Sequence, residues 1–424
     1  MVRWWHVRPS TTRVGAPPRL PASKSHAQRA LWLAGFVGGE VRGRFATLGD
    51  DVVVLCDALR ALGARIDVDA DRIVVARTVP RPPQGELQLR ENGTALRTAA
   101  AIVAILRGNV VVDGDAGLRR RSRAAVDAFL AAATGIVITP PWPWRIDATH
   151  AVWSEPFVVD ASHTTQVATG AMLGLAIRAA DGGARATLRV VRPTASGYVR
   201  LTADVMRAFG AAVELDDGGD DIVVRIGSGL RACRYDVLAD PSAALFPATL
   251  AAIRGQPFGG TEGHDAHPDR RALDVLAAVV APGDETRSFD LGACPDAFPA
   301  LCVAAATRSG TTRFVGALAL RDKESDRIAA MVAVLRTVGV DADERADGAD
   351  LRGPIPRAGA AVTFDRLDDH RIVMAAALLG TQRDAGVAIA DRGAVAKSWP
   401  DFFEWLGSVA TVSSTSPSAD RPGS

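Results

Sequence analysis

Several features that mark large classes of proteins are absent from this sequence. Its four cysteines have no C-x-x-C spacing, which argues against a zinc knuckle or a disulfide framework and favours a reducing cytoplasm. Because no run of about 18 apolar residues occurs, we expect no transmembrane helix. The N-terminal segment lacks the apolar core of a secretory signal. A net charge of +1 gives no electrostatic reason to expect a nucleic-acid partner. Glycine-rich nucleotide-binding loops are also absent.

Lysine is scarce as well. Among the 49 lysines and arginines, only Lys24, Lys323 and Lys397 are lysines. Where either cation suffices this chain uses arginine, so a retained lysine marks a position where a compact ammonium is needed instead of a planar guanidinium. Chance retention is the alternative, but all three lysines lie in short polar clusters: SKSHAQR, RDKESDR and VAKSWPDFF. We therefore expect the lysines to mark the functional site.

A recurring pattern predicts the architecture. The length of 424 residues suits two domains of about 200 residues each. Apolar-periodic helices end at a glycine and are followed by alternating strand patterns at 59–75, 129–139, 206–226 and 335–353. Equivalent glycines recur about every 65 to 75 residues, which indicates a repeated α/β unit, and roughly six units fit the chain. Alanine-rich helices should be buried. The Ser/Thr/Pro-rich stretch 408–424 is predicted to be a disordered tail.

Cations, hydroxyls and acid–base side chains gather at the expected helix starts. These candidates are Lys24, Ser25 and Arg29; Gly93, Thr94 and Arg97; Arg121; Thr164, Thr165 and Gln166; Asp296; Lys323, Glu324 and Arg327; His370 and Arg371; and Lys397. Thr94 also offers a helix cap. A helix N-terminus attracts anions through its unpaired N–H groups, so the pattern predicts a shared anionic site. No metal-ligand spacing or nucleophilic triad accompanies it. Proton transfer on a polyanion is the chemistry implied; capped, solvated helix ends are the alternative.

These segments resemble the motifs of the EPSP synthase family of enolpyruvyl transferases. LPASKSHAQRAL is similar to LPGSKSxxNRAL, GTALRT to GTAMRP, GDAGLRRRS to GDxxLRxRP and DASHTTQ to DGSxSSQ. Further along the chain, PDAFPAL is similar to PDAAMTL, LRDKESDR to LRxKExDR, DDHRIVM to NDHRMAM and AKSWPDFFEWL to TKTFPDYFExL. The motifs keep their order from residue 20 to residue 406, which is nearly the whole chain.

The resemblance implies transfer of the enolpyruvyl group of phosphoenolpyruvate to the 5-hydroxyl of shikimate 3-phosphate in the shikimate pathway of aromatic amino acid biosynthesis. Phosphate leaves by addition and elimination, without a metal or organic cofactor. We expect a cytoplasmic monomer with small-molecule partners only. The implied fold is a two-domain inverse α/β barrel of six βαβαββ units, three per domain. Its domains would comprise residues 1–21 with 237–407, and 22–236, and would close on an active site in the interdomain cleft.

Roles carry over from the resemblance position by position. The catalytic residues would be Lys24, Asp296, Glu324, His370 and Lys397. Asp296 would accept the hydroxyl proton, while Glu324 and Lys24 would handle protons at the methylene carbon and the oxygens. Phosphoenolpyruvate would be bound by Lys24, Gly93, Thr94, Arg97, Arg121, Gln166, Arg327, Arg371 and Lys397. Shikimate 3-phosphate would be bound by Lys24, Ser25, Arg29, Thr164, Thr165, Gln166, Ser196, Tyr198, Asp296 and Lys323.

Some positions depart from the family pattern. Two threonines replace its Ser-Ser pair, Gly197 stands where its S-x-P-Y segment has proline, and Arg200 stands where an aspartate is common. The departures lie on the acceptor side or in loops. A related transferase acting on another cyclic alcohol in specialised metabolism is therefore the first alternative. A catalytically silent, anion-binding paralogue is the second, and the retained acid–base residues argue against it. The UDP-sugar branch expects an asparagine after the early lysine and a loop cysteine, and both are missing.

Overall fold

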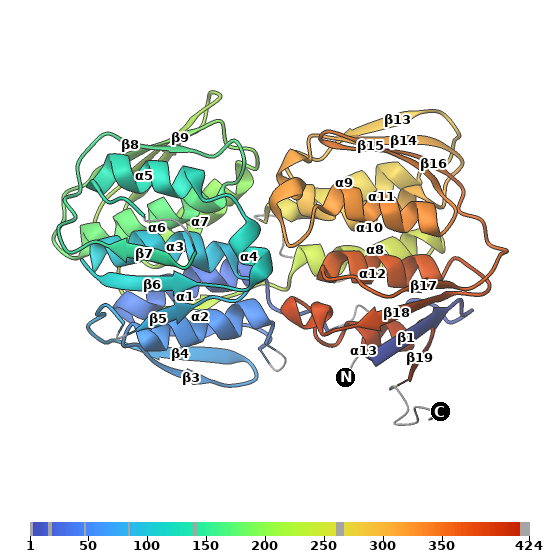
Figure 1. The fold of residues 1–424 in the computed structure, drawn as a ribbon, viewed down its shortest axis with the longest axis horizontal. Coiled ribbons are helices and arrows are strands. Elements are labelled where there is room, and N and C mark those ends of the chain that lie inside the picture. The colour runs from blue at the N-terminus through green and yellow to red at the C-terminus, as the bar shows by residue number, and fades with distance from the viewer. Residues whose placement is uncertain are drawn as a thin grey trace, which may run out of the picture. The chain divides into compact units, whose positions relative to one another are not determined.

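The chain divides into two compact units. The computed structural model describes residues 3–15, 19–45, 48–83, 85–138, 142–259 and 267–415. Unit 1 contains the described parts of Met1–Leu20, Pro241–Asp265 and Asp269–Ser424, and unit 2 those of Pro21–Asp240 and Ala266–Pro268. The chain thus enters unit 2 after Leu20, leaves it after Asp240 and contributes residues 267–268 to it again. Both units mix helices and strands (Figure 1).

Unit 2 encloses its helices between sheets. Its helices are α1 (Lys24–Val37), α2 (Asp50–Ala61), α3 (Gly93–Ile105), α4 (Ala116–Arg120), α5 (Ala124–Thr134), α6 (Gln166–Ala180) and α7 (Gly197–Ala208). Its strands are β2 (Gly39–Arg42), β3 (Arg65–Val68), β4 (Arg72–Ala76), β5 (Glu86–Gln88), β6 (Asn109–Asp113), β7 (Trp144–Asp147), β8 (Phe157–Asp160), β9 (Ala186–Val191), β10 (Val213–Asp216), β11 (Ile222–Ile226) and β12 (Cys233–Asp236). The sheet orders are β12-β2-β4-β3, β10-β11-β9-β8 and β5-β6-β7. Figure 1 shows the helices between β8–β9 and β3–β4.

Unit 1 has the same layering. Its α-helices are α8 (Pro241–Ile253), α9 (Arg271–Val280), α10 (Phe298–Ala305), α11 (Arg327–Thr337), α12 (His370–Gly380) and α13 (Phe402–Gly407). Its strands are β1 (Arg3–Arg8), β13 (Arg287–Asp290), β14 (Gly310–Val315), β15 (Asp341–Arg345), β16 (Gly348–Gly353), β17 (Val362–Phe364), β18 (Val387–Asp391) and β19 (Thr411–Thr415). They form two mixed sheets, β17-β18-β1-β19 and β13-β14-β16-β15, with helices between them (Figure 1). Short 3-10 turns η2 (Pro295–Ala297), η3 (Leu318–Asp322) and η4 (Ala394–Lys397) connect the elements.

The helix-ending glycines of the repeated sequence pattern are confirmed. Gly63, Gly135, Gly210 and Gly339 follow helices α2, α5, α7 and α11 with φ values of 97°, 74°, 87° and 88°. These left-handed angles suit glycine because it has no Cβ to clash with the preceding turn. Alanine-rich helices are buried as expected, since nearly every residue of α3 and α8 is inaccessible to solvent. Mixed α/β architecture is therefore established by both the pattern and the structure.

One predicted strand is wrong. Residues 136–138 follow Gly135 without strand pairing, and residue 139 lies outside the described residues. Ile136 and Ile138 are nevertheless buried, with 4% and 3% of their surfaces exposed. Their alternation reflects contact with the core and not pairing with a neighbouring strand.

The predicted disordered tail needs correction at its start. Val409 and Ala410 are buried, and β19 pairs antiparallel with β1 from Arg8↔Thr411 to Trp4↔Thr415. The threonine and valine of this stretch suit an edge strand, and backbone pairing with β1 outweighs the disorder-prone composition. Residues 416–424 lie outside the described residues.

Candidate functional site

Lys24 begins helix α1 of unit 2 and is partly buried beside polar side chains. Ser23 caps the helix by accepting a hydrogen bond from the backbone N–H of His26 at 3.5 Å. The Nζ of Lys24 donates to Oδ2 of Asp51 on α2 at 3.0 Å, and the two side chains are 20% and 8% exposed. Asn92 donates to the backbone carbonyl of Asp51 at 2.8 Å. The first lysine is thus held in place by a carboxylate at a helix N-terminus.

Two guanidinium groups converge on Gly93, the first residue of α3. A Cβ at this position would lie 2.5 Å from an Nη atom of Arg121 and 2.8 Å from one of Arg97. The same Arg97 nitrogen donates to Oε1 of Gln166 at 2.7 Å and to the carbonyl of Gly93 at 3.2 Å. Arg121 also lies 3.6 Å from a carboxylate oxygen of Glu91. Only glycine leaves room for two buried arginines at a helix start, a combination that favours an anion.

The cap of α3 differs from the prediction. Asn92, and not Thr94, supplies it: Oδ1 of Asn92 accepts the backbone N–H of Ala95 at 2.9 Å. Asparagine reaches the N3 position when it directly precedes the helix, whereas Thr94 already lies within the first turn. The hydroxyl of Thr94 is therefore not used for capping.

Arg29 ties α1 to two other helices of unit 2. Its Nε donates to the hydroxyl of Thr202 on α7 at 2.8 Å, and an Nη donates to the hydroxyl of Thr169 on α6 at 2.9 Å. A further Nη donates to the carbonyl of Ser25 at 2.8 Å, and the guanidinium lies 5.6 Å from the ring centroid of Tyr198. Burial lowers the pKa of Arg29 to about 10, which leaves it cationic at neutral pH.

Hydroxyl groups flank the starts of α6 and α7. The backbone N–H of Gln166 donates to the hydroxyl of Thr164 at 3.3 Å. Thr165 and Ser196 occupy the cap positions of α6 and α7, and neither makes a side-chain capping bond in the described structure. The hydroxyls of Thr165 and Ser196 are therefore positioned beside helix N-termini without serving as caps, which suits a phosphate group.

The second cluster, in unit 1, is centred on Arg327 at the start of α11. Its Nε donates to Asp369 at 2.7 Å, and its two Nη atoms donate to Asp296 at 2.8 Å and Glu324 at 2.5 Å. The side chain is only 2% exposed. Burial alone would lower the pKa of Arg327, but Asp369, Glu324 and Asp296 outweigh it and raise the pKa. One buried guanidinium thus orients three carboxylates.

Both remaining lysines complete this cluster. Nζ of Lys323 lies 3.2 Å from Oδ1 of Asp296, and Nζ of Lys397 lies 3.1 Å from Oε1 of Glu324. Arg371 approaches the other oxygen of Asp296 at 3.7 Å. Burial alone would raise the pKa of Asp296, but Lys323, Arg371 and Arg327 together hold it well below its ordinary value. Asp296 is therefore ionised at neutral pH. Asp296 contacts both Arg327 and Lys323, and Glu324 contacts both Arg327 and Lys397.

Asp369 links the cluster to helix α12. Its Oδ1 accepts the backbone N–H of Arg371 at 2.9 Å, which caps the helix, and its Oδ2 accepts the hydroxyl of Ser325 at 3.2 Å. His370 is fully buried, with Nδ1 3.7 Å from Asp369. Within the described residues, no three His, Cys, Asp or Glu side chains are arranged as a metal site.

Three carboxylates of these clusters were missed by the sequence analysis: Asp51, Glu91 and Asp369. Each is the partner of a predicted cation that lies on a different helix or loop. A buried cation is often paired with a carboxylate, but the partner's position follows only from the fold. Asp369 alone carried a local signal, because an aspartate directly before a helix is a strong capping residue.

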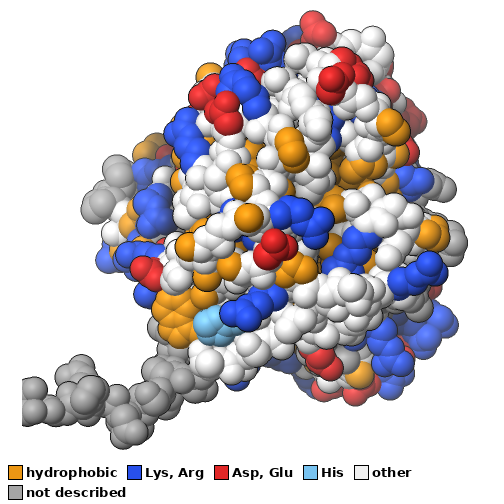
Figure 2. Space-filling view, turned by 90° about the vertical axis from the view of Figure 1, so that its right-hand side faces the viewer, with side chains coloured by type: hydrophobic (Ala, Val, Ile, Leu, Met, Phe, Trp, Pro, Cys, Tyr) orange, Lys and Arg blue, Asp and Glu red, His pale blue; other side chains and the backbone are white. Residues whose placement is uncertain are grey.

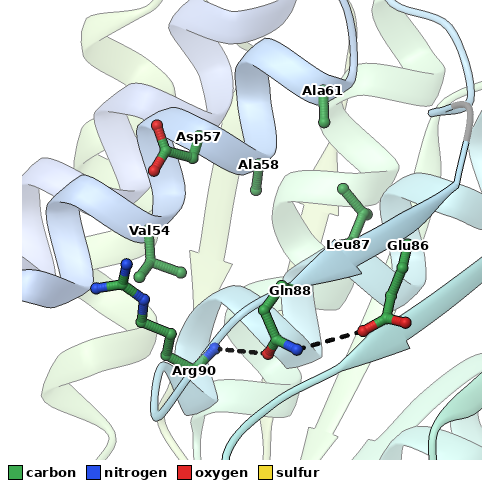
Figure 3. A pocket seen from close by; sticks show the side chains of 8 residues that line it. All are labelled: Val54, Asp57, Ala58, Ala61, Glu86, Leu87, Gln88 and Arg90. Carbon is green, nitrogen blue, oxygen red and sulfur yellow. Dashed lines mark hydrogen bonds between the residues drawn. The ribbon is translucent and has the colours of Figure 1, made fainter.

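A separate pocket of about 240 Å³ lies between α2 and β5 (Figure 3). Val54, Ala58, Ala61 and Leu87 form apolar parts of its lining, and polar side chains, including a hydrogen-bonded row on β5, form the rest. It contains none of the predicted site residues.

On the face of unit 1 shown in Figure 2, basic and acidic side chains are interspersed with apolar ones. Every described helix is too short or too polar to cross a membrane.

Solved structures of enolpyruvyl transferases have the same fold. An EPSP synthase from Acinetobacter baumannii aligns with a TM-score of 0.75 at 22% identity, covering 98% of this chain and 100% of that one. The enolpyruvyl transferase NikO from Streptomyces tendae aligns with a TM-score of 0.70 at 16% identity, covering 98% and 99%. At these identities the likeness establishes the fold, a two-unit arrangement of helices and mixed sheets.

Sequence comparison identifies the family. The model of EPSP synthase (3-phosphoshikimate 1-carboxyvinyltransferase) matches residues 10–260 and 263–406. The 3-phosphoshikimate 1-carboxyvinyltransferase of Methanocorpusculum labreanum is 31% identical over 421 residues, covering 93% of this chain and 96% of the relative. That of Rhizobium leguminosarum bv. trifolii is 33% identical over 410 residues, covering 92% and 94%. This chain belongs to the EPSP synthase family, which confirms the resemblance seen in its motifs.

Proposed function

We propose that the protein transfers the enolpyruvyl group of phosphoenolpyruvate to the 5-hydroxyl of shikimate 3-phosphate and releases inorganic phosphate. The observation that carries this proposal is the Arg327 cluster, in which Asp296 and Glu324 each contact Arg327 and a lysine. Such an arrangement provides ionised carboxylates and ammonium groups for proton transfer next to cations that attract an anionic substrate. Family membership supports the choice of substrates.

The unit 2 cluster is proposed to bind anionic groups. Arg121 and Gln166, together with Lys397 of unit 1, would hold the phosphate of phosphoenolpyruvate, and Arg97 would support that pocket. Gly93 and Thr94 would allow the phosphate to approach the backbone at the start of α3. For shikimate 3-phosphate, the proposed ligands in this unit are Lys24, Ser25, Arg29, Thr164, Thr165, Gln166, Ser196 and Tyr198.

The unit 1 cluster is proposed to transfer protons. Asp296 accepts the proton of the attacking hydroxyl, and Glu324, together with Lys24 of unit 2, exchanges protons with the methylene carbon and the oxygens. The low pKa of Asp296 would make it a weak base, but anionic substrates bound to Lys323 and Arg371 would offset the cations that depress it. Negative charge arriving with the substrates thus raises the basicity of Asp296 when the proton must move.

Arg327 and Arg371 are proposed to meet the carboxylate of phosphoenolpyruvate. Three of the five N–H groups of Arg327 are engaged by carboxylates of the protein, which leaves two for a ligand. Arg327 can therefore hold Asp296 and Glu324 in position and still contact substrate. His370, buried beside Asp369, is proposed to support this arrangement.

The reaction follows as addition and elimination. The hydroxyl oxygen bonds to C2 of phosphoenolpyruvate as C3 gains a proton and becomes a methyl group. The adduct then loses phosphate from C2 and one proton from C3, which restores the double bond and yields the enolpyruvyl ether. We also propose that both clusters serve this one reaction in a cleft that closes. The finer architecture of six repeats in two inverse barrels, the monomeric state and the cytoplasmic location remain proposals.

The proposal is tested by mixing the protein with shikimate 3-phosphate and phosphoenolpyruvate and measuring phosphate release together with product mass. We expect phosphate and the enolpyruvyl ether in equal amounts, and neither when one substrate is omitted. An absence of product at millimolar concentrations of both substrates would refute the acceptor assignment. Product formation with a different cyclic alcohol phosphate would identify the true acceptor, while inactivity with all of them would refute the enzymatic function.

A further inference from the structure

His267 and Pro268 belong structurally to unit 2, although the chain from Asp269 onward belongs to unit 1. His267 is buried, with 3% of its surface exposed. Its Nε2 lies 3.2 Å from the hydroxyl of Ser23, the residue that caps α1. Its ring meets that of His26 edge-on at 5.3 Å between centroids. This short segment is thus packed against the start of α1, although 244 positions of sequence separate His267 from Ser23.

The same segment contacts the start of α7. The ring of His267 meets that of Tyr198 edge-on at 5.9 Å. Next to it, Pro268 fills the space beside Gly197, where an added Cβ would lie 2.7 Å from Cβ of Pro268. Gly197 stands where the family motif has proline. Any side chain at this position would collide with Pro268, so the contact requires glycine here.

Beyond Pro268 the chain is fixed in unit 1. The hydroxyl of Ser242, at the start of α8, donates to Oδ2 of Asp269, and both side chains are buried. The segment is therefore anchored at both ends: by Ser23 through His267, and by Ser242 through Asp269. An anchored segment can impose a fixed geometry on what it touches, whereas a free loop cannot.

We propose that His267 and Pro268 position the starts of α1 and α7 for the acceptor and thereby set the affinity for the phosphorylated cyclic alcohol. This inference rests on the proposed function, in which Lys24 and Ser25 on α1, and Ser196 and Tyr198 beside or on α7, contact that alcohol. His267 acts through Ser23 and Tyr198 and is a positioning residue. Its loss shifts the acceptor-binding groups and leaves the Arg327 cluster intact.

The first test replaces His267 with alanine and compares steady-state constants for both substrates. We expect KM for shikimate 3-phosphate to rise about 10-fold, as for the loss of a buried hydrogen bond with its packing, and KM for phosphoenolpyruvate to change less than about two-fold. His267→Gln, whose amide can reach Ser23, should recover much of the loss. His150→Ala removes an exposed histidine of the same unit and should leave both constants unchanged.

The second test uses the contact between Pro268 and Gly197. Gly197→Ala should raise KM for shikimate 3-phosphate because its Cβ collides with Pro268. In the double variant Gly197→Ala with Pro268→Gly, the second substitution removes the Cβ of residue 268 that causes the collision. KM for shikimate 3-phosphate should therefore be lower in the double variant than in Gly197→Ala alone. Equal constants for the single and double variants would show that Gly197 is required for another reason and would overturn the role of Pro268.

Binding measurements separate this inference from the proposed function. Calorimetry should show weaker binding of shikimate 3-phosphate to His267→Ala than to the unaltered protein, at temperatures where thermal unfolding shows both to be folded. If the unaltered protein neither binds nor converts shikimate 3-phosphate, the proposed function fails. If it does both and His267→Ala has the same KM and affinity, the positioning role is refuted.

Discussion

The clusters in the two units contain similar cations in different surroundings. In unit 2, Arg97 and Arg121 converge on Gly93. Arg97 donates to an amide oxygen and two backbone carbonyls, and one carboxylate, that of Glu91, lies 3.6 Å from Arg121. In unit 1, Arg327 binds three carboxylates, and two of those carboxylates also contact lysines. Cations with few carboxylate partners keep more of their positive field for an anion, whereas cations bound to several carboxylates hold groups that can exchange protons. On this ground we propose that unit 2 chiefly binds anions and that unit 1 chiefly transfers protons.

The largest expected effect concerns stability in unit 1. Replacing Arg327 with methionine leaves three carboxylates buried without their shared cation, which should cost about 3 to 5 kcal/mol of unfolding free energy. Denaturant unfolding provides the measurement. Arg313→Met removes a largely exposed arginine of the same unit from Asp350, which keeps Arg345 as a second partner, and should cost at most about 1 kcal/mol. Equal losses for both variants would contradict the central role of Arg327.

The next effect separates chemistry from binding. Glu324→Gln keeps the shape of the side chain but removes its proton-transfer capacity, so kcat should fall by about 10²-fold or more while KM for phosphoenolpyruvate changes little. Steady-state rates of phosphate release measure it. Glu344→Gln, in the same unit and paired with Arg321 at the surface, should retain full activity. A rise in KM with unchanged kcat would instead place Glu324 in substrate binding.

A change in unit 2 should give the opposite pattern. A Cβ at Gly93 would displace Arg121 and Arg97, so Gly93→Ala should lower kcat/KM for phosphoenolpyruvate by about 10²-fold, chiefly through KM. Initial rates over a range of phosphoenolpyruvate concentrations test this. Gly219→Ala is the matched control, because nothing lies within 4 Å of a Cβ there. An unchanged kcat/KM for phosphoenolpyruvate in Gly93→Ala would contradict the proposed division of roles between the units.

The smallest expected effect tests whether position 24 needs a lysine and not just a cation. Lys24→Arg keeps the positive charge but replaces the ammonium that contacts Asp51, so kcat/KM should fall only about 10-fold. Kinetics with both substrates measure the loss. The reverse change at the surface, Arg189→Lys, should have no effect because its side chain is 62% exposed. Full activity of Lys24→Arg would mean that either cation suffices at this position.

The sequence predicted what is encoded locally. Helix-ending glycines such as Gly210 and buried alanine-rich helices such as α3 follow from backbone sterics and from composition. The three lysines do lie in polar clusters, each ion-paired to a carboxylate and at most 22% exposed. Their roles in catalysis remain proposals.

Contacts between residues far apart in the sequence could not be predicted from local patterns. Asp51 pairs with Lys24 only because α2 packs beside α1, and His267 reaches Ser23 across 244 positions of sequence. The order of residues 411–415 likewise depends on β1, at the opposite end of the chain. The alternation in the sequence correctly indicated that Ile136 and Ile138 are buried. It could not indicate whether they form a strand, because strand formation depends on a second strand elsewhere in the chain.

The most direct test of the central claim is the reaction in D₂O. If the protein adds the hydroxyl to phosphoenolpyruvate and then eliminates phosphate, C3 gains a solvent deuteron before losing a hydrogen. Mass spectrometry should therefore find deuterium in the vinyl methylene of the enolpyruvyl ether formed from shikimate 3-phosphate. Product without deuterium, or no product at all, would contradict the account.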